Sequence, residues 1–280
     1  MKTFYANFWR EMKYNFGRKG VWIGRFVNIF VTILTSFAMG LIYTFSSGAG
    51  TALGVNNVGL FLLTGFFLQF LVLSGVSLAP ASFWEDIRSG SLEFIFNQEF
   101  SVTQYIFGMY LSQFIIDFLI SVPFLVTIII ITSTRAYPFL TMLAFVGFLL
   151  LAFLCLFAFT MLYSSLYMLS KHFFGYHRVV SNIAYFICGV YFPVASYLSL
   201  FGNVGGWITI GFISVLPYTQ IFDIARYIIF GSTYTLALTH LWIEFVVLIV
   251  TSILFYVLAL LIFKKGFKKL RNEGFPSYRY

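Results

Sequence analysis

The acidic side chains of this chain are few, and four of the nine fall close together between residues 85 and 99. They are Glu85, Asp86, Glu93 and Glu99. Arg88, Gly90 and Leu92 lie among them, so carboxylates are combined with a cation, a glycine that lets the chain bend and an apolar side chain. This combination is typical of a surface that docks on a basic partner protein, because complementary charges guide recognition. A local role is the alternative, in which Glu93 only caps the chain or pairs with Arg88.

Patterns that carry catalysis or bind metal are missing from the sequence. It contains no Gly-x-x-x-x-Gly-Lys-Ser/Thr loop for nucleotide phosphates, and no Gly-x-Ser-x-Gly or His-Glu-x-x-His motif. His172 and His177 lack a third ligand nearby, so an anchoring role for their loop is favoured over a metal site. Two cysteines, Cys155 and Cys188, are too few for a disulfide framework. We expect no catalytic residue, metal or cofactor on this chain.

The composition is that of a membrane protein. Hydrophobic residues make up 60% of the chain and charged residues only 9%, whereas about a quarter of the residues in soluble domains are charged. Several apolar runs are long enough to cross about 30 Å of hydrocarbon as helices. Because no stretch alternates as a barrel strand does, those runs must be helical. We predict an all-α integral membrane protein, formed by residues 1–280 as one transmembrane domain.

Six transmembrane helices fit the apolar runs. Their predicted ranges are residues 27–45, 58–79, 105–132, 139–163, 179–200 and 241–263. The second span is expected to end at Pro80, directly before the acidic stretch at 83–100. Pro123 is expected to kink the third span. Glu244, at the start of the sixth, is expected at the membrane interface.

The basic residues predict the orientation of these spans. If both termini are cytoplasmic, fifteen of the 17 Lys and Arg residues lie inside, all except Arg135 and Arg226. Cytoplasmic loops of membrane proteins carry such an excess. We therefore expect a multi-pass protein of the plasma or inner membrane, with a basic cytoplasmic tail at 264–280. Because the cations lie beside spans, the net charge of +8 does not indicate nucleic-acid binding.

Residues 1–26 are predicted to form a helix that lies along the inner surface of the membrane. Its aromatic and apolar side chains fall on one helical face, with Arg10 and Lys13 away from the centre of that face. These side chains are Tyr5, Phe8, Trp9, Met12 and Phe16. A solvated basic tail is the alternative interpretation.

The segment 201–240 is too apolar for a simple loop and too rich in glycine for a simple span. Pro217 interrupts it, and Asp223 and Arg226, three residues apart, can share a helix face. We predict re-entrant short helices between the fifth and sixth spans. The alternative is an interfacial loop that rests on the membrane.

Asp117 lies near the middle of the third span, where a carboxylate costs about 2.5–3.5 kcal/mol on insertion scales. Gln113 and Ser121 lie one turn away on either side. Two roles are open. Asp117 is either a proton, cation or substrate-path site, or an interhelical hydrogen-bonding group that fixes packing, and the second is favoured.

Three stretches, taken in order, resemble the membrane subunit of ABC-2 type transporters, the export permease family. Residues 86–93 (Asp-Ile-Arg-Ser-Gly-Ser-Leu-Glu) are similar to the family's charged run that ends in Gly-Thr-Leu-Glu. Residues 189–193 (Gly-Val-Tyr-Phe-Pro) are similar to its Gly-Val-Phe-Phe-Pro motif. Residues 216–226 are similar to the segment with Pro and a later Arg before its last span. The layout agrees along nearly the whole chain, while Glu99 and Met109 depart from the family pattern.

The resemblance implies a permease subunit that is not itself an enzyme. It would pair with a second permease half, identical or not, and with ABC ATP-binding subunits, which would hold ATP and Mg²⁺. The stretch 83–100 would contain the coupling helix that contacts the ATPase. The residues in it expected to couple are Glu85, Asp86, Arg88, Gly90, Leu92 and Glu93.

The resemblance also implies a substrate path lined by spans one and five. Residues that could contribute to it are Asp117, Tyr185, Tyr191, Phe192 and Tyr197, although lipid-facing aromatics are the commoner case. An aromatic path suits outward transport of a lipophilic or amphipathic compound, such as a drug-like molecule, a peptide or a lipid. Export of a polysaccharide or glycolipid is one alternative, and an ATPase-independent membrane channel or an integral membrane enzyme is another.

Overall fold

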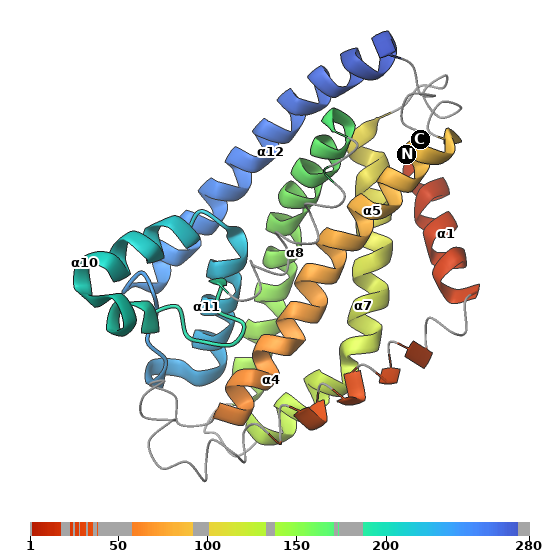
Figure 1. Ribbon diagram of the computed structural model, residues 1–280. Coiled ribbons are helices and arrows are strands. Elements are labelled where there is room, and N and C mark those ends of the chain that lie inside the picture. The colour runs from red at the N-terminus through yellow and green to blue at the C-terminus, as the bar shows by residue number, and fades with distance from the viewer. Residues whose placement is uncertain are drawn as a thin grey trace.

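The computed structural model describes residues 2–17, 58–91, 101–132, 138–170 and 187–273, with residue 173 and short helical pieces between residues 23 and 38. Within these residues the chain forms helices and turns (Figure 1). The expected all-helical membrane architecture is confirmed at this level. Most of the first predicted span and the beginning of the fifth lie outside the described residues.

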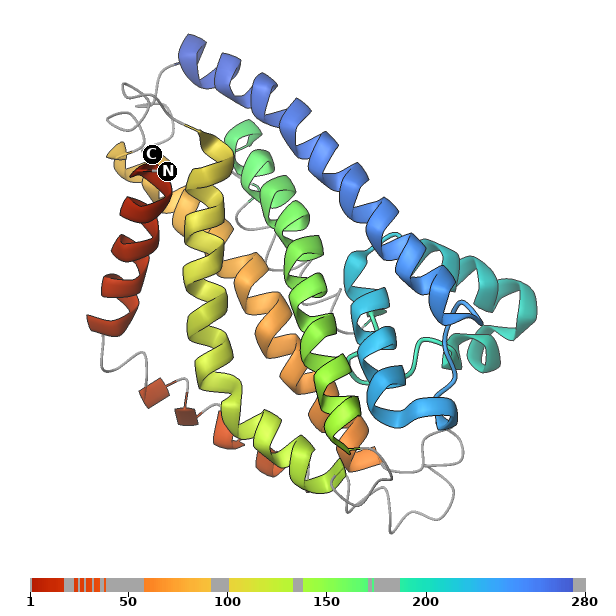
Figure 2. The ribbon, with the colours of Figure 1, turned by 180° about the vertical axis from the view of Figure 1, so that it is seen from behind.

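Three long apolar helices form the body of the protein: α7 (Val102–Thr132), α8 (Pro138–Leu169) and α12 (Leu241–Glu273). Each contains 29–31 residues that are apolar enough to cross a membrane, which requires about 20. They coincide with three of the predicted spans, although α12 continues beyond residue 263 into the basic tail. Figure 2 shows α7 bending in its second half, which contains Pro123, as expected for a proline inside a helix.

Two further helices, α4 (Val58–Leu68) and α5 (Ser74–Ser89), are joined end to end by a π-helical turn, η1 (Gln69–Leu73). Figure 1 shows them as one long rod. The expected end at Pro80 is wrong for the helix, because α5 passes through this buried proline and ends only at Ser89. Packing against neighbouring helices allows a proline to remain inside a membrane helix. The first acidic residues therefore belong to the end of the rod and not to a separate turn.

The predicted fifth span, 179–200, is interrupted in its described part. The chain turns between Cys188 and Ala195 before a new helix, α10 (Ser196–Ile213), begins. Gly189 has a φ of +95°, which side-chain-bearing residues rarely adopt. Pro193 in addition lacks an N–H for a helical hydrogen bond. These two residues explain why the span does not continue to residue 200.

The segment 201–240 is largely helical, which supports short helices over an interfacial loop. Helix α10 is kinked at Gly202, and α11 (Pro217–Phe230) and the 3-10 turn η2 (Gly231–Thr233) follow it. The two helices are bent by 106° relative to each other, the geometry of a broken span or a re-entrant loop. Almost every residue of α11 is buried, against α4, α8 and α12.

The N-terminal helix, α1 (Lys2–Gly17), packs on α7. Asn7 and Glu11 are buried against the protein, and the rings of Phe4 and Phe107 stack at 5.8 Å. Tyr5, Trp9 and Phe16 from the predicted aromatic face are about half exposed. The helix thus leaves much of its aromatic face exposed, while Asn7 and Glu11 are buried.

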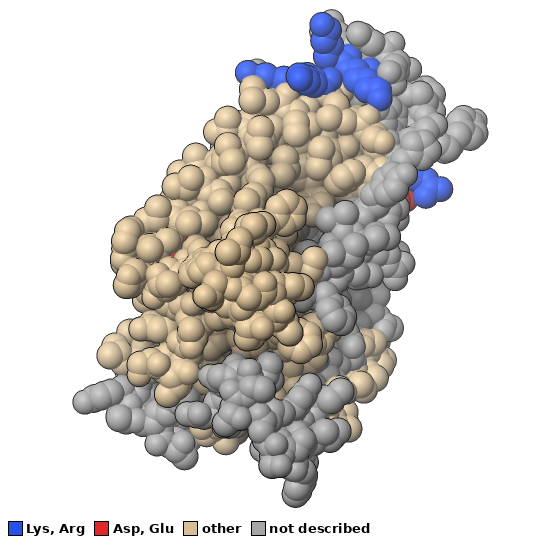
Figure 3. Space-filling view, turned by 60° about the vertical axis from the view of Figure 1, so that its left-hand side comes forward, with Lys and Arg blue, Asp and Glu red and all other residues tan. Residues whose placement is uncertain are grey.

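Helix α1 begins and α12 ends at the same end of the molecule (Figure 1), which we call the basic end. Figure 3 shows lysine and arginine side chains gathered where α12 ends, above a face whose described residues are almost entirely uncharged. Lys269 of α12 donates to the carbonyl of Leu169, at 2.9 Å, and so caps the end of α8. Gly266 permits this approach, because a Cβ there would lie 2.8 Å from the Cβ of Met168.

Gly108 is the point of closest approach between α1 and α7, since a Cβ at this position would lie 3.0 Å from the carbonyl oxygen of Phe4. We expect Gly108→Val to reduce the free energy of unfolding by about 1–3 kcal/mol through overpacking. Unfolding of the purified protein in detergent measures the change. Gly147→Val in α8 is the matched control, because no atom lies within 4 Å of the added Cβ. Equal effects of the two substitutions would contradict the predicted packing constraint.

Candidate functional site

The acidic stretch begins where α5 ends, at the basic end of the molecule. Glu85 and Arg88 are exposed, whereas Ile87 between them is buried. Gly90 terminates the helix with a φ of +76°, and its N–H donates to the carbonyl of Ile87 at 3.2 Å. The predicted bend at Gly90 is therefore confirmed. Leu92 and Glu93 lie outside the described residues.

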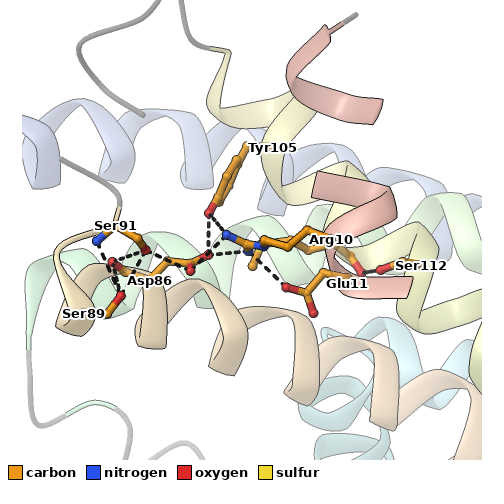
Figure 4. A network of polar contacts seen from close by, with 8 residues as sticks. Arg10, Glu11, Asp86, Ser89, Ser91, Tyr105 and Ser112 are labelled. Atoms are coloured by element: carbon orange, nitrogen blue, oxygen red, sulfur yellow. Dashed lines mark hydrogen bonds and ion pairs between the residues drawn. The ribbon is translucent and has the colours of Figure 1, made fainter. Parts of the chain in front are cut away.

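Asp86 is the centre of a polar network that joins three helices (Figure 4). Its two carboxylate oxygens accept hydrogen bonds from the two terminal nitrogens of Arg10 in α1, at 3.2 and 2.7 Å. The hydroxyl of Tyr105 in α7 donates to the same carboxylate, as does Ser91 at 3.1 Å. A two-pronged contact between guanidinium and carboxylate is strong and directional. It therefore holds α1 and α7 against the end of α5.

Burial changes the protonation equilibria of the α1 side chains in this network. Burial alone lowers the pKa of Arg10, but Tyr105, Asp86 and Glu11 together raise it above its usual value, so the guanidinium stays charged. Burial raises the pKa of Glu11, although Arg10, whose Nη2 lies 3.0 Å from Oε1, opposes the shift. The stability that neutral Glu11 contributes is complete at acidic pH and is lost as the pH rises through this raised pKa.

The predicted coupling residues thus have different roles in the structure. Asp86 is engaged by groups of its own chain, and Gly90 shapes the end of α5. Glu85 and Arg88 direct their charges outward. The part of the described stretch that is open to a partner protein is therefore this exposed pair.

A second polar cluster is buried around Arg226 in α11, whose side chain has no exposed surface. Nη1 donates to the carbonyl of Gly189, and Nη2 donates to the carbonyl of Val190 at 2.7 Å. Both carbonyls belong to the segment where the predicted fifth span is interrupted. Carbonyls that leave a helix in apolar surroundings need donors. Arg226 supplies two, and so ties α11 to the interrupted segment.

Helix α4 forms the other wall around this guanidinium. The Cζ atom of Arg226 lies 3.6 Å from the centre of the Phe61 ring, within the range of cation–π attraction. Nη2 also lies 3.5 Å from the carbonyl oxygen of Phe61. Gly65, one turn further along α4, leaves room for the group, since a Cβ there would lie 2.5 Å from both Nη2 and the Val190 carbonyl oxygen.

The other predicted residues of this segment have partners of their own. Asp223 is fully buried, and it accepts hydrogen bonds from the hydroxyl of Tyr234 at 2.5 Å and from the N–H of Ala237 at 2.7 Å. Among the described contacts, Asp223 and Arg226 do not form an ion pair within 4.0 Å. Pro217 starts α11, a position where its missing N–H costs nothing.

Asp117 is fully buried in α7, and Gln113 donates to both oxygens of its carboxylate at 3.0 Å. This hydrogen bond lies within one helix, whereas an interhelical bond was expected. Ser121 donates instead to the carbonyl of Phe118 in the preceding turn, at 2.9 Å. The bond to Gln113 thus agrees with a packing role, and the expected interhelical bond stays a prediction.

Three of the aromatic residues predicted for a substrate path lie in the interrupted segment or at the start of α10, which follows it. Tyr191 packs edge-on against Phe66, with ring centres 5.7 Å apart, and Phe192 is 40% exposed. Tyr197 donates to the carbonyl of Ile187 at 3.1 Å. Tyr185 lies outside the described residues. These side chains therefore lie beside the break, apart from Asp117 on α7.

A groove of about 360 Å³ lies between α8 and α12. Its walls are mostly apolar, which suits a hydrocarbon chain better than a charged ligand. The lining residues are Leu151, Leu154, Cys155, Phe157, Ala158, Ile249, Ser252, Ile253 and Tyr256. None of the predicted path residues that the structure describes is among them.

Sequence reasoning missed the residues that complete both polar clusters. Arg10 was assigned to the membrane surface, and position 105 entered only as the start of the predicted third span. A rule that each buried or half-buried charge needs a named partner would have led to a search for them. Phe61 and Gly65 carry no such signal, because phenylalanine and glycine are common throughout this chain.

Comparison with known proteins assigns no family to this geometry. No protein-family model matches the chain, and no curated protein matches it significantly. Inferences about function therefore depend on the arrangement of the residues and on the resemblance of the three stretches.

We expect Arg10→Ala and Asp86→Asn to destabilise the protein non-additively, because each removes the same guanidinium–carboxylate contact. Since 38% of the Arg10 side chain is exposed, solvent screens the pair and the coupling energy should be about 1 kcal/mol. A double-mutant cycle on unfolding in detergent measures it. Lys13→Ala, an exposed cation on the same helix, is the control and should be additive with Asp86→Asn. Additive effects of the first two substitutions would show that the contact between Arg10 and Asp86 does not stabilise the protein.

We expect Gly65→Ala to displace the Arg226 guanidinium from its carbonyl partners, because neither the Val190 carbonyl nor the guanidinium can move without breaking a hydrogen bond. The free energy of unfolding in detergent should fall by about 1–3 kcal/mol. Gly211→Ala in α10 is the control, since its added Cβ has no atom within 4 Å. If Gly65→Ala were as stable as this control, the close approach at α4 would not constrain the fold.

Proposed function

We propose that this chain is the transmembrane subunit of an ATP-driven exporter, and that a cytoplasmic ATP-binding subunit docks at the end of α5. The supporting observation is the rod α4–η1–α5, which runs from the Arg226 cluster to the exposed pair Glu85 and Arg88. A partner bound at that pair would act on one end of a continuous element. The resemblance of residues 86–93 to the coupling stretch of ABC-2 permeases adds to this proposal.

The contacts at the end of α5 favour transmission of motion over passive attachment. Arg10 and Tyr105 hold Asp86, so a displacement of this end has to move α1 and α7 as well. At the other end of the rod, Phe61 and Gly65 touch the Arg226 guanidinium. A force on the exposed pair therefore has a physical route to the interrupted segment.

Two of the stretches that resemble the permease family meet through one side chain. Arg226, in the stretch 216–226, donates to the carbonyls of Gly189 and Val190, in the stretch 189–193. Residues 194–215 separate the two stretches, so a chance resemblance of each would not require this contact. Their meeting supports the proposal that both have a common structural purpose.

The membrane arrangement proposed here has six spans, both termini in the cytoplasm and α10–α11 re-entrant from the outer side. The basic end, with Lys264, Lys265 and Lys268, would then face the cytoplasm, in accordance with the excess of cations there. The aromatic face of α1 would lie on the inner membrane surface. A second permease half would complete the path for a lipophilic or amphipathic substrate.

Affinity purification of the tagged chain from its native host in mild detergent tests this proposal. We expect a protein with a P-loop to co-purify and to hydrolyse ATP. The double variant Glu85→Lys/Arg88→Glu keeps the net charge but exchanges the two signs, so it should lose most of that partner. Lys265→Glu, also exposed at the basic end, is the control and should retain it.

The thermal stability of the double variant separates docking from folding. Because Glu85 and Arg88 are exposed, the midpoint of unfolding should match that of the unaltered chain. Absence of any P-loop ATPase from the unaltered complex, or its equal recovery with the double variant, would refute docking at this pair.

A further inference from the structure

Glu244 lies in the first turn of α12, and its side chain is fully buried. Its carboxyl group therefore points into the protein, and the expected position of this turn at the membrane interface stays a prediction. One oxygen, Oε1, accepts a hydrogen bond from the N–H of Leu238 at 3.0 Å. The other, Oε2, has no N–H or O–H donor among the described residues. Burying a carboxylate oxygen without a hydrogen-bond donor costs free energy. The protonation state of Glu244 therefore depends on the group beside it.

The group beside it is a second carboxyl. The N–H of Ala237 donates to Asp223 of α11, and the N–H of the adjacent Leu238 donates to Glu244, so the two carboxyl groups lie close to each other. Asp223 already accepts hydrogen bonds from Tyr234 and from the N–H of Ala237. These donors stabilise a negative charge on Asp223 and not on Glu244. Two carboxylates in contact cannot both be ionised at low cost, and a proton between them removes the repulsion and fills the vacant hydrogen bond.

We propose that Asp223 and Glu244 form a proton-binding site, in which Glu244 carries the proton and donates it to ionised Asp223. The site joins α11 to the first turn of α12. It is independent of any ATP-binding partner, since it uses side chains of this chain alone.

The charged and titratable groups around the site agree with one bound proton. Arg226 of α11 is the nearby cation, and it balances a single negative charge on the pair. Tyr234, which follows η2, contributes a neutral hydroxyl as donor. His240 precedes α12, but its side chain is exposed. One cation against one anion leaves the buried cluster neutral, whereas loss of the proton would add an uncompensated charge.

The proton therefore stabilises the contact between α11 and α12. When it is present, α11, the segment 234–238 and α12 share one hydrogen-bonded cluster. When it leaves, two adjacent negative charges repel each other inside the protein. The expected result is weaker attachment of the α10–α11 pair to α12 as the pH rises.

The variant Glu244→Gln tests this site, because its amide N–H can replace the bound proton and its carbonyl can still accept from Leu238. We expect the unaltered protein to lose a few degrees of its unfolding midpoint between mildly acidic and alkaline pH. Glu244→Gln should match its stability at acidic pH and show a smaller fall, because only the fall that Glu11 causes remains. Glu85→Gln, an exposed control, should keep the fall. A fall as large in Glu244→Gln as in the unaltered protein would overturn the proposal.

Infrared difference spectroscopy provides a readout that a merely structural role would not change. At neutral pH the unaltered protein should show the carbonyl stretch of a protonated carboxylic acid, shifted in heavy water. This band should lose intensity in Glu244→Gln and not in Glu85→Gln. An unchanged band in Glu244→Gln would show that Glu244 carries no proton, whatever the stability of the variant.

Discussion

Carbonyl groups that leave a helix in apolar surroundings must find donors within the protein, and this requirement determines how the bent part of the molecule is built. The turn that follows Cys188 exposes the carbonyls of Gly189 and Val190, and Arg226 reaches both. The position of α11 follows from that contact. So does the glycine at 65 in α4, because the guanidinium occupies the space that a side chain would take. One arginine therefore relates three separate segments of sequence.

The two arginine clusters are related through the rod α4–η1–α5. Arg226 contacts one end of it at Phe61, and Arg10 holds the other end at Asp86. The clusters differ in their exposure, since Arg226 is fully buried and 38% of the Arg10 side chain is accessible. Solvent weakens only the second contact. The Arg226 end is thus the firmer anchor, and the Asp86 end is the one that can release and re-form.

Sequence patterns predicted the elements whose cause is local, and failed where the cause is distant. The helices α7, α8 and α12 follow from apolar length alone, and the bend at Gly90 from the conformational freedom of glycine. The helix α5 continues through Pro80 because neighbouring helices pack against it. The residues next to Pro80 in the sequence do not reveal this packing. Burial of Glu244 depends in the same way on Asp223, a residue of another helix. The partners Arg10 and Tyr105 were missed because residues that pair between different helices have no regular separation in the sequence.

The length of the rod determines what its exposed end can contact. From Val58 to Ser89 the three elements follow one another without a gap, and at 1.5 Å per residue they extend over about 48 Å. Hydrocarbon accounts for about 30 Å of a bilayer. If α4 lies within the membrane, the last turns of α5 must project into water unless the rod is strongly tilted. A charged pair at such a projecting end is accessible to a soluble protein. The π-turn and Pro80 are the places where the rod can bend when a force acts on this end. Whether force at Glu85 reaches Arg226 therefore depends on the stiffness of these two positions.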